Sequence, residues 1–205
     1  NTGPLRVGYQ GDGTLHVEGG GVVSNAHSSI GTSSSSTGMA TVTGASSRWT
    51  NSSNLYVGSS GNGTLNVEAG GVVSNTYGHL GYNVGSTGEA TVTGPGSQWS
   101  NSNSLFIGGN GSQARGTGTL NLADRGLVTV SSITKLWSTG TINQDGGNLT
   151  TGSFDNTDLG TLNFHDGTLT VNGAGGVFNP GTAHFTIDGN VITDLPELVV
   201  ANTAT

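Results

Sequence analysis

The acidic side chains that could carry out hydrolysis lie in the second half of the chain, at Asp145, Asp155, Asp158 and Asp166. Glycoside hydrolysis uses two carboxyl groups about 5–9.5 Å apart. The separation of Asp145 and Asp166 is close to the spacing of the later sequence repeats, so they could meet on the surface. Each precedes a glycine, and corner turns of the Asx type explain such pairs without catalysis. We interpret both as corner residues and keep a carbohydrate-active lyase or glycosidase as the alternative.

Basic residues and histidines are spread along the chain rather than clustered: Arg6, Arg48, Arg115, Arg125 and Lys135; His16, His27, His79, His165 and His184. A polysaccharide lyase would need a base beside acidic neighbours, so this scatter argues against one. A zinc site needs three or four ligands, and only His165 and His184, separated by about one coil, are spaced to be neighbours. We therefore expect exposed histidines, no catalytic residues, no metal and no cofactor.

Tryptophans and threonines offer two further ligand-binding chemistries. Trp49 and Trp99 share one position of the 50-residue repeat, and Trp137 follows later. Exposed indole rings can stack on sugars, but we favour packing over a sheet edge or corner, and no ligand-binding residue is assigned. Threonine recurs at outward positions such as Thr14 and Thr64. A flat threonine array can bind ice, yet His, Glu and Asn interrupt this one, so an ice-binding solenoid stays a minor alternative.

The composition argues against an ordinary globular domain. Of the 205 residues 38 are glycine, and only 8% are charged, against an average of about 25%. The formal charge of −7 disfavours nucleic acid and anionic membranes as partners. There is no cysteine, and no apolar run approaches the roughly 20 residues that span a bilayer. Because Asn1 follows no signal peptide, we expect a processed or cut fragment of a soluble, exported protein.

An internal repeat dominates the sequence. Residues 5–54 and 55–104 align without a gap, and 28 of the 50 aligned positions are identical. Each 50-residue unit contains two 25-residue coils, because glycine, leucine or alanine, and valine recur at that spacing. One such set is Leu5, Ile30, Leu55, Leu80 and Leu105. Repeats of this period are typical of solenoids.

Within a coil, the pattern is that of β-strands. Leu65 and Val67 alternate with polar residues, which places them on one face of a strand. Strands end at glycines, which permit tight corners. Identical positions in successive coils predict that Leu stacks on Leu and Val on Val in a parallel solenoid. Glutamates at 18 and 68 alternate with threonines at 43 and 93, which keeps like charges from facing each other.

We expect one all-β domain over 1–205 with three regions. Residues 1–104 form the regular 50-residue double coils, and 105–135 form an irregular coil with an inserted loop near 112–116. Residues 136–205 form shorter coils with a 20-residue period and a C-terminal tail. Roughly eight or nine coils would make a tapering rod on the order of 40 Å long.

The chain resembles the passenger regions of bacterial autotransporters and related repeat-rich surface proteins. The matching stretches are GTLNVEAGGVVSN (63–75), ATVTG-x-x-S-x-W (40–49 and 90–99), GGNLTTGSF (146–154) and GTLNFHDGTLTV (160–171). The resemblance implies a single-stranded, right-handed parallel β-helix displayed outside a Gram-negative cell.

From shape and composition we expect a non-catalytic, extracellular structural or adhesive module on the bacterial cell surface. Its partners would be carbohydrate, a cell surface or copies of itself. The apolar stretch 195–205 has no polar cap, and solenoid ends need one for solubility. This end would therefore favour end-to-end association into filaments.

Overall fold

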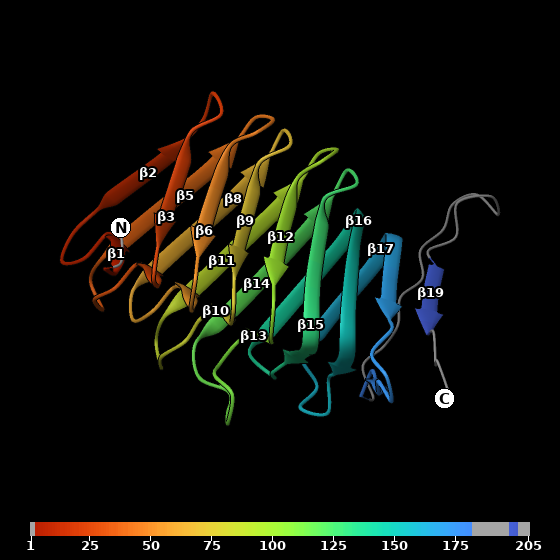
Figure 1. Cartoon of the computed structure of the whole chain (residues 1–205). Coiled ribbons are helices and arrows are strands. Elements are labelled where there is room, and N and C mark those ends of the chain that lie inside the picture. Colours follow the sequence, from red (N-terminus) through yellow and green to blue (C-terminus); the bar gives the residue numbers. More distant parts are fainter. Residues whose placement is uncertain (1–2, 182–196, 201–205) are drawn as a thin grey trace.

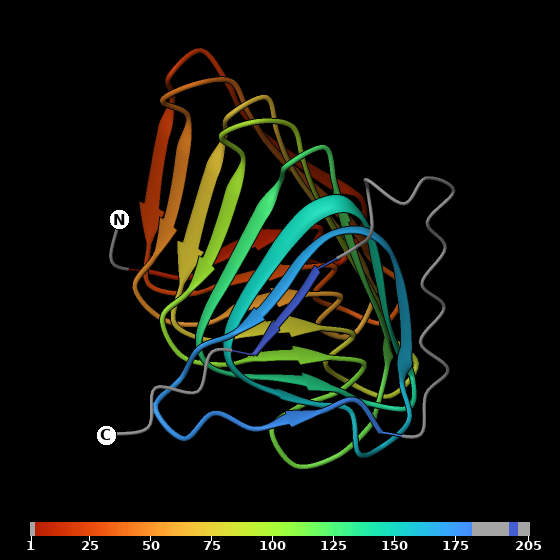
Figure 2. The same ribbon diagram turned by 90° about the vertical axis from the view of Figure 1, so that its right-hand side faces the viewer.

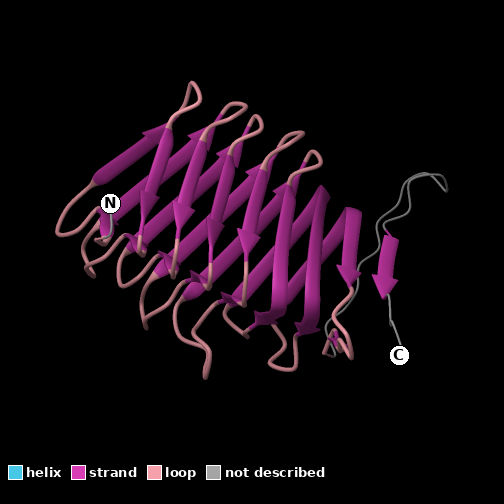
Figure 3. Ribbon diagram, viewed as in Figure 1, coloured by secondary structure: helices cyan, strands magenta, loops and turns pink. Residues whose placement is uncertain are grey.

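The computed structural model describes residues 3–181 and 197–200, and within them the chain is a parallel β-solenoid (Figures 1 and 3). All strand pairs are parallel, and no helix occurs in these residues. Over the described residues the solenoid makes about seven turns, whereas the eight or nine expected were counted over the whole chain. The further coil expected over 181–195 lies almost entirely outside the described residues.

Three strands per coil build three faces, each a stack of parallel strands. The first face contains β2 (Gly13–Val17), β5 (Thr37–Thr43), β8 (Asn62–Glu68), β11 (Thr87–Thr93), β14 (Thr117–Ala123) and parts of β16 (Gly140–Asp155) and β17 (Thr161–Val171). The second contains β3 (Val22–Asn25), β6 (Arg48–Asn51), β9 (Val72–Asn75), β12 (Gln98–Asn101), β15 (Leu127–Leu136), the continuations of β16 and β17, and β19 (Glu197–Val200). The third contains β1 (Leu5–Val7), β4 (Ser28–Ile30), β7 (Leu55–Val57), β10 (Gly78–Leu80), β13 (Leu105–Ile107), the ends of β15 and β16, and β18 (Phe178–Asn179).

The first face confirms the predicted 25-residue register. Gly13, Gly38 and Gly63 pair in successive coils, and Glu68 lies between Thr43 and Thr93. Thr87 then pairs with Thr117, a step that includes the five inserted residues. The 20-residue step in the C-terminal coils is also confirmed, since Thr141 pairs with Thr161 and Leu149 with Leu169.

The third face contradicts the leucine column expected from the 25-residue spacing. Leu5 pairs with Ser28, which pairs with Leu55, so a shorter and a longer step alternate along this face. Ile30 instead stacks between Val7 and Val57. The cause is the length of the loops that join the strands at the three corners. Two successive coils have the same total number of residues but place different numbers of them in each loop. The two coils of a 50-residue unit therefore have the same length and differ only in the positions at which the chain turns.

Inward-facing side chains fill a narrow core along the whole axis. Leu65, Val67 and their counterparts beyond the first coil are buried, which is the main source of stability for such a stack of strands. Trp49 and Trp99 also belong to this core, with no exposed surface. The expectation that they cover a sheet edge or a corner was therefore wrong, and they lie inside the solenoid.

A ladder of buried asparagines runs beside the tryptophans at the end of the second face. The amide of Asn25 donates to Asn51 Oδ1 over 2.7 Å, and that of Asn75 donates to Asn101 Oδ1 over 2.6 Å. Each indole N–H donates to an asparagine of the preceding coil: Trp49 to Asn25 over 2.9 Å, and Trp99 to Asn75 over 2.7 Å. The ladder thus satisfies buried polar groups that would otherwise destabilise the core.

The ladder stops at Asn101, whose buried amide nitrogen has no hydrogen-bond partner in the part of the chain that the structure describes. The residue paired with it in the next coil is Val130, which is buried and followed by Thr151. We expect Val130→Asn to extend the ladder, accepting from Asn101 and donating to Thr151, and to stabilise the fold by about 1 kcal/mol. Urea denaturation measures this.

Val128→Asn is the control for this substitution, because Val128 is buried next to Trp99 and Leu149 and has no asparagine in register. It should destabilise the protein, since it buries an unpaired amide. Equal losses in both variants would contradict the proposed extension of the ladder.

The outline narrows toward the C-terminus, as expected. The corner between the first and second faces projects as a loop in the N-terminal coils and disappears in β16 and β17, which bend across it (Figure 2). Within the expected apolar tail 195–205, residues 197–200 form β19, which pairs with β17. The rest of that tail lies outside the described residues.

Candidate functional site

The third face carries a stack of rings on its outer surface. Tyr56, His79 and Phe106 occupy the central, outward positions of β7, β10 and β13 and are aligned by strand pairing. The ring centroids of Tyr56 and His79 are 4.9 Å apart, and those of His79 and Phe106 are 5.0 Å apart. The planes are within 13° and 20° of parallel, so the three rings form one continuous aromatic column.

Tyr82 completes this column from the corner that follows β10. Its ring meets Tyr56 and His79 edge-on, with centroid distances of 4.7 and 5.0 Å. The four rings line an open hollow with a volume of about 340 Å³. Tyr56, Tyr82 and Phe106 are partly exposed, whereas His79 is buried between them. The hollow therefore offers apolar ring surface to a ligand.

The inserted loop forms one wall of the hollow. Gly109 and Ala114 form an antiparallel bridge, and Asn110 Oδ1 accepts hydrogen bonds from the backbone of Ser112 and Gln113. The backbone of Gly111 lies against the ring of Phe106, because a Cβ at this glycine would be 3.5 Å from Cζ. The sequence prediction of a loop here is confirmed, and the loop turns a flat face into a hollow.

Uncharged hydrogen-bonding groups surround the rings. Tyr56 Oη accepts from Asn54 Nδ2 over 2.7 Å, and Tyr77 Oη accepts from Asn103 Nδ2 over 2.9 Å. Each phenol thereby keeps its own O–H for an acceptor on a ligand. Since Asn54 and Tyr77 line the hollow together with the inserted loop, its walls are polar and its floor is aromatic.

Burial keeps the imidazole of His79 neutral. Desolvation lowers the pKa of His79 to about 4, and a backbone contact with Gly109 acts in the opposite direction. The prediction that the histidines are exposed is therefore wrong for His79, which is 6% exposed. His16, His27 and His165 are exposed, as predicted, and His184 lies outside the described residues.

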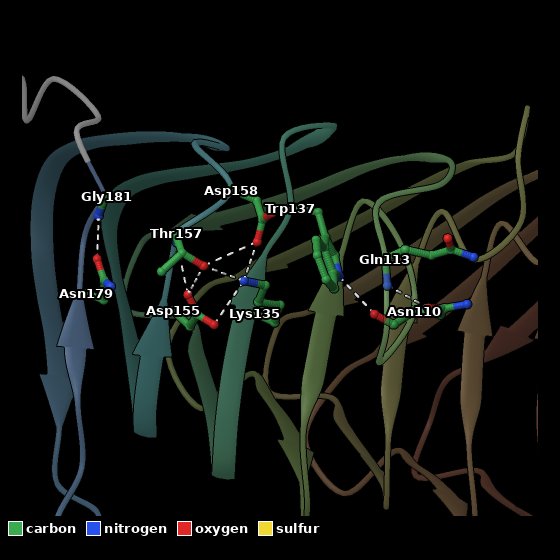
Figure 4. A network of polar contacts seen from close by, with 9 residues as sticks. All are labelled: Asn110, Gln113, Lys135, Trp137, Asp155, Thr157, Asp158, Asn179 and Gly181. Carbon is green, nitrogen blue, oxygen red and sulfur yellow. Dashed lines mark hydrogen bonds and ion pairs between the residues drawn. The ribbon is translucent and has the colours of Figure 1, made fainter.

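Beyond the loop, Lys135 anchors a charged cluster in the same outward column (Figure 4). Its ammonium group donates to Asp155 and Thr157 over 2.9 and 2.8 Å, pairs with Asp158, and lies 4.5 Å from the centroid of the Trp137 ring. Desolvation lowers the pKa of Lys135, but the two carboxylates outweigh this and raise it overall. Burial raises the pKa of Asp155, yet hydrogen bonds from Thr157 and Lys135 lower it overall.

Trp137 ties this cluster to the inserted loop. Its indole N–H donates to the carbonyl of Asn110 over 2.9 Å (Figure 4), and its ring is partly exposed beside Lys135. The same tryptophan therefore contacts a wall of the hollow and the ammonium group.

We expect Lys135→Met to destabilise the protein by about 1–2 kcal/mol at neutral pH, because it leaves Asp155 and Asp158 close together without their cation. This loss is smaller than for a fully buried ion pair, because the side chains of the two carboxylates are 28% and 42% exposed. Thermal unfolding measures it. Arg48→Met, on the exposed side of β6, is the control, and an equal loss there would contradict a specific role for the cluster.

The acidic pair singled out in the sequence does meet in register, since Asp145 pairs with Asp166 in the next coil. Asp166 Oδ1 accepts from the backbone of Gly167 over 2.6 Å, and both following glycines have positive φ angles, 82° at Gly146 and 100° at Gly167. The positive φ angles agree with a turn of the chain at these glycines, but the hydrogen bond of Asp166 goes to the next residue rather than two residues on, so it is not that of an Asx turn.

The outward threonines of the first face do not form one regular array. Thr14 and Thr64 share a column with Met39, and Glu89 follows in the next coil. In the C-terminal coils Asn143 instead forms an outer ladder with Asn121 and Asn163, with hydrogen bonds of 2.8 Å on each side.

A second hollow, of about 360 Å³, lies between the second and third faces and is lined by serine, threonine and asparagine: Asn51, Ser52, Ser74, Asn75, Thr76, Ser100, Asn101, Ser102, Thr129 and Ser131. It offers hydrogen bonds and no aromatic surface. The ring-lined hollow combines both kinds of contact, so we regard it as the better candidate site.

The aromatic site was not predicted from the sequence, although a signal for it was present. Tyr56 and Phe106 each lie between two apolar residues of a short strand, and a period of two turns such central residues outward. A strict 25-residue spacing aligns Tyr56 with Gly81 rather than with His79. The rings become neighbours because the number of residues between paired positions on the third face alternates between a smaller and a larger value.

The described residues contain no group of three or more acidic or histidine side chains placed to hold a metal ion. They also contain no helix with the length and apolar character needed to cross a membrane. The fold and this surface define the class of the protein as a parallel β-solenoid with an aromatic hollow on one face. No protein-family model, curated protein or solved structure matches the chain.

Proposed function

We propose that this β-solenoid is a non-catalytic, extracellular scaffold and adhesive module of the kind found in autotransporter passengers and repeat-rich surface proteins. The observation that carries the proposal is the ring-lined hollow of the third face, which offers aromatic surface and neutral hydrogen-bonding groups on rigid strands. The similarity of the repeat sequences to those of passenger regions supports the cell-surface setting.

The rigidity of the scaffold also supports adhesion. Tyr56, His79 and Phe106 are held on strands that pair on both sides, and the buried hydrogen bond from Asn75 to Asn101 links two of the coils that carry them. A binding surface on such strands is preorganised, which reduces the entropy lost on binding.

An adhesion assay tests the proposed function. Beads coated with the chain should attach to polysaccharide films or cell layers, and Tyr82→Ala beads should attach much less. Tyr9→Ala is the matched control, because Tyr9 is an exposed tyrosine of another coil with Arg6 over its ring. Attachment no better than that of uncoated beads would overturn the proposal.

A second proposal is end-to-end association, which the first coil favours. Strands β1, β2 and β3 pair, within the described residues, only with strands of the following coil. Leu5, Leu15 and Val23 are only partly buried there, although they pack against the core. Exposed edges with apolar residues bind further strands.

Light scattering over a range of concentrations tests this association. We expect the mass to rise with concentration for the unmodified chain and to stay monomeric for Leu15→Lys. A monomer at all concentrations would contradict it.

A further inference from the structure

We infer that the hollow between Tyr56, Tyr82, Phe106 and the inserted loop binds an uncharged saccharide, with the apolar C–H face of a pyranose packed on the aromatic floor. This inference rests on the proposed adhesive function and names the ligand class of that site. Three features support it: the shape of the floor, the polar walls and the absence of charge in the lining.

The floor suits the apolar face of a sugar ring. The nearly parallel rings of the column face one another, so the column turns mainly its apolar ring edges outward, and the apolar C–H face of a pyranose can pack on them. Tyr82 stands edge-on to Tyr56 and His79, at 71° and 82°, so it forms a raised side rather than a continuation of the floor. A flat ring can therefore lie on the column and against Tyr82.

The walls suit the equatorial hydroxyl groups of the same ring. The phenol groups of Tyr56 and Tyr77 are oriented by Asn54 and Asn103. From the inserted loop, Ser112 supplies a hydroxyl group on a backbone fixed by its own hydrogen bonds. Donors and acceptors at the rim of an apolar floor match hydroxyl groups at the rim of a sugar.

The charge of the site favours an uncharged ligand over an anionic one. Among the described residues, those that line the hollow include no aspartate, glutamate, lysine or arginine and form an uncharged set: Asn54, Tyr56, Tyr77, His79, Tyr82, Phe106, Asn110, Gly111 and Ser112. His79 belongs to this set because burial disfavours its charged form. Uronic acids and sulfated sugars would find no cation in the lining to pair with. Neutral hexoses and pentoses need no such partner.

Isothermal titration with uncharged hexasaccharides of glucose, mannose and xylose, and with a hexagalacturonate, tests the inference. We expect at least one uncharged hexasaccharide to bind, with hexagalacturonate binding more weakly or not at all. Tyr82→Ala should weaken binding about tenfold. The fluorescence of Trp137, which contacts the loop through Asn110, should change on binding.

Gly111→Leu provides a variant that removes no ring. A Cβ at Gly111 meets the Phe106 ring at ordinary contact distance, and its φ angle is not left-handed, so a leucine there should fill the hollow without strain. Binding should be lost while the circular dichroism spectrum is unchanged. Tyr9→Ala should bind like the unmodified chain.

The outcomes separate the ligand class from the adhesive function. If Gly111→Leu binds saccharide as well as the unmodified chain, the site is wrong. If hexagalacturonate alone binds, or if no saccharide binds while coated beads still adhere and lose adhesion in Tyr82→Ala, the ligand class is wrong and adhesion stands. If neither binding nor adhesion occurs, both proposals are overturned.

Discussion

Asn75→Ala should lower the free energy of unfolding by about 4 kcal/mol. The substitution removes the acceptor of the Trp99 indole N–H and the donor to Asn101 Oδ1, and both neighbours are buried. Each orphaned buried polar group costs about 1–3 kcal/mol, and the cavity left by the amide adds to this. Equilibrium urea denaturation followed by circular dichroism measures the loss.

Asn143→Ala is the matched control for this variant. Asn143 also makes two ladder hydrogen bonds, to Asn121 and from Asn163, but it lies on the outer, partly exposed face. Water replaces its partners there, so we expect a loss of less than about 1 kcal/mol. Similar losses in the two variants would show that burial of the inner ladder has no special role.

Acidification should lower the stability of the protein by about 3 kcal/mol between pH 6.5 and pH 4 through His79. Desolvation holds the pKa of His79 at about 4 in the folded chain, below its ordinary value of 6.5. The unfolded chain therefore binds more protons in this range, so stability is complete above pH 6.5 and declines as the pH falls toward 4. The groups that face His79 are Tyr56, Tyr82, Phe106 and the backbone of Gly109, and none of them is a carboxylate or a cation.

His79→Phe tests this assignment, because a phenyl ring preserves the stack with Tyr56 and Phe106 and does not titrate. Stability measured by urea denaturation should then be nearly constant from pH 6.5 to 4. The lowered pKa of Asp155 acts in a separate range, since its contribution is lost only as the pH falls below about 4. A variant that keeps the full loss between pH 6.5 and 4 would contradict the role of His79.

The fold could be predicted in large part because identical residues recur where strands stack. The glycine column beginning at Gly13 and Gly38 follows from spacing alone, and so does the alternation of Leu65 and Val67. The third face could not be derived in this way. The position of a corner depends on how two packed coils fit together, and a constant repeat length does not reveal how its residues are divided among three corners.

The candidate site was harder to predict for the same reason. Tyr56 and His79 are separated by fewer than 25 residues, and His79 and Phe106 by more than 25. An alignment with a constant 25-residue period therefore does not place the three rings together. The burial of Trp49 and Trp99 was missed because their partners, Asn25 and Asn75, belong to the preceding coil. Indoles with a buried acceptor belong in a core, and the acceptors were visible only once the coils were stacked.

The division of each coil into unequal corners also limits how a gene for such a protein can grow or shrink. Duplication or loss of a complete pair of coils preserves the order Leu5, Ser28, Leu55 on the third face. A change by a single coil would set two coils of the same kind against each other, shift the third face and separate rings that now stack. We therefore expect natural length variants of this solenoid to differ by even numbers of coils, with the aromatic hollow inherited as part of a pair.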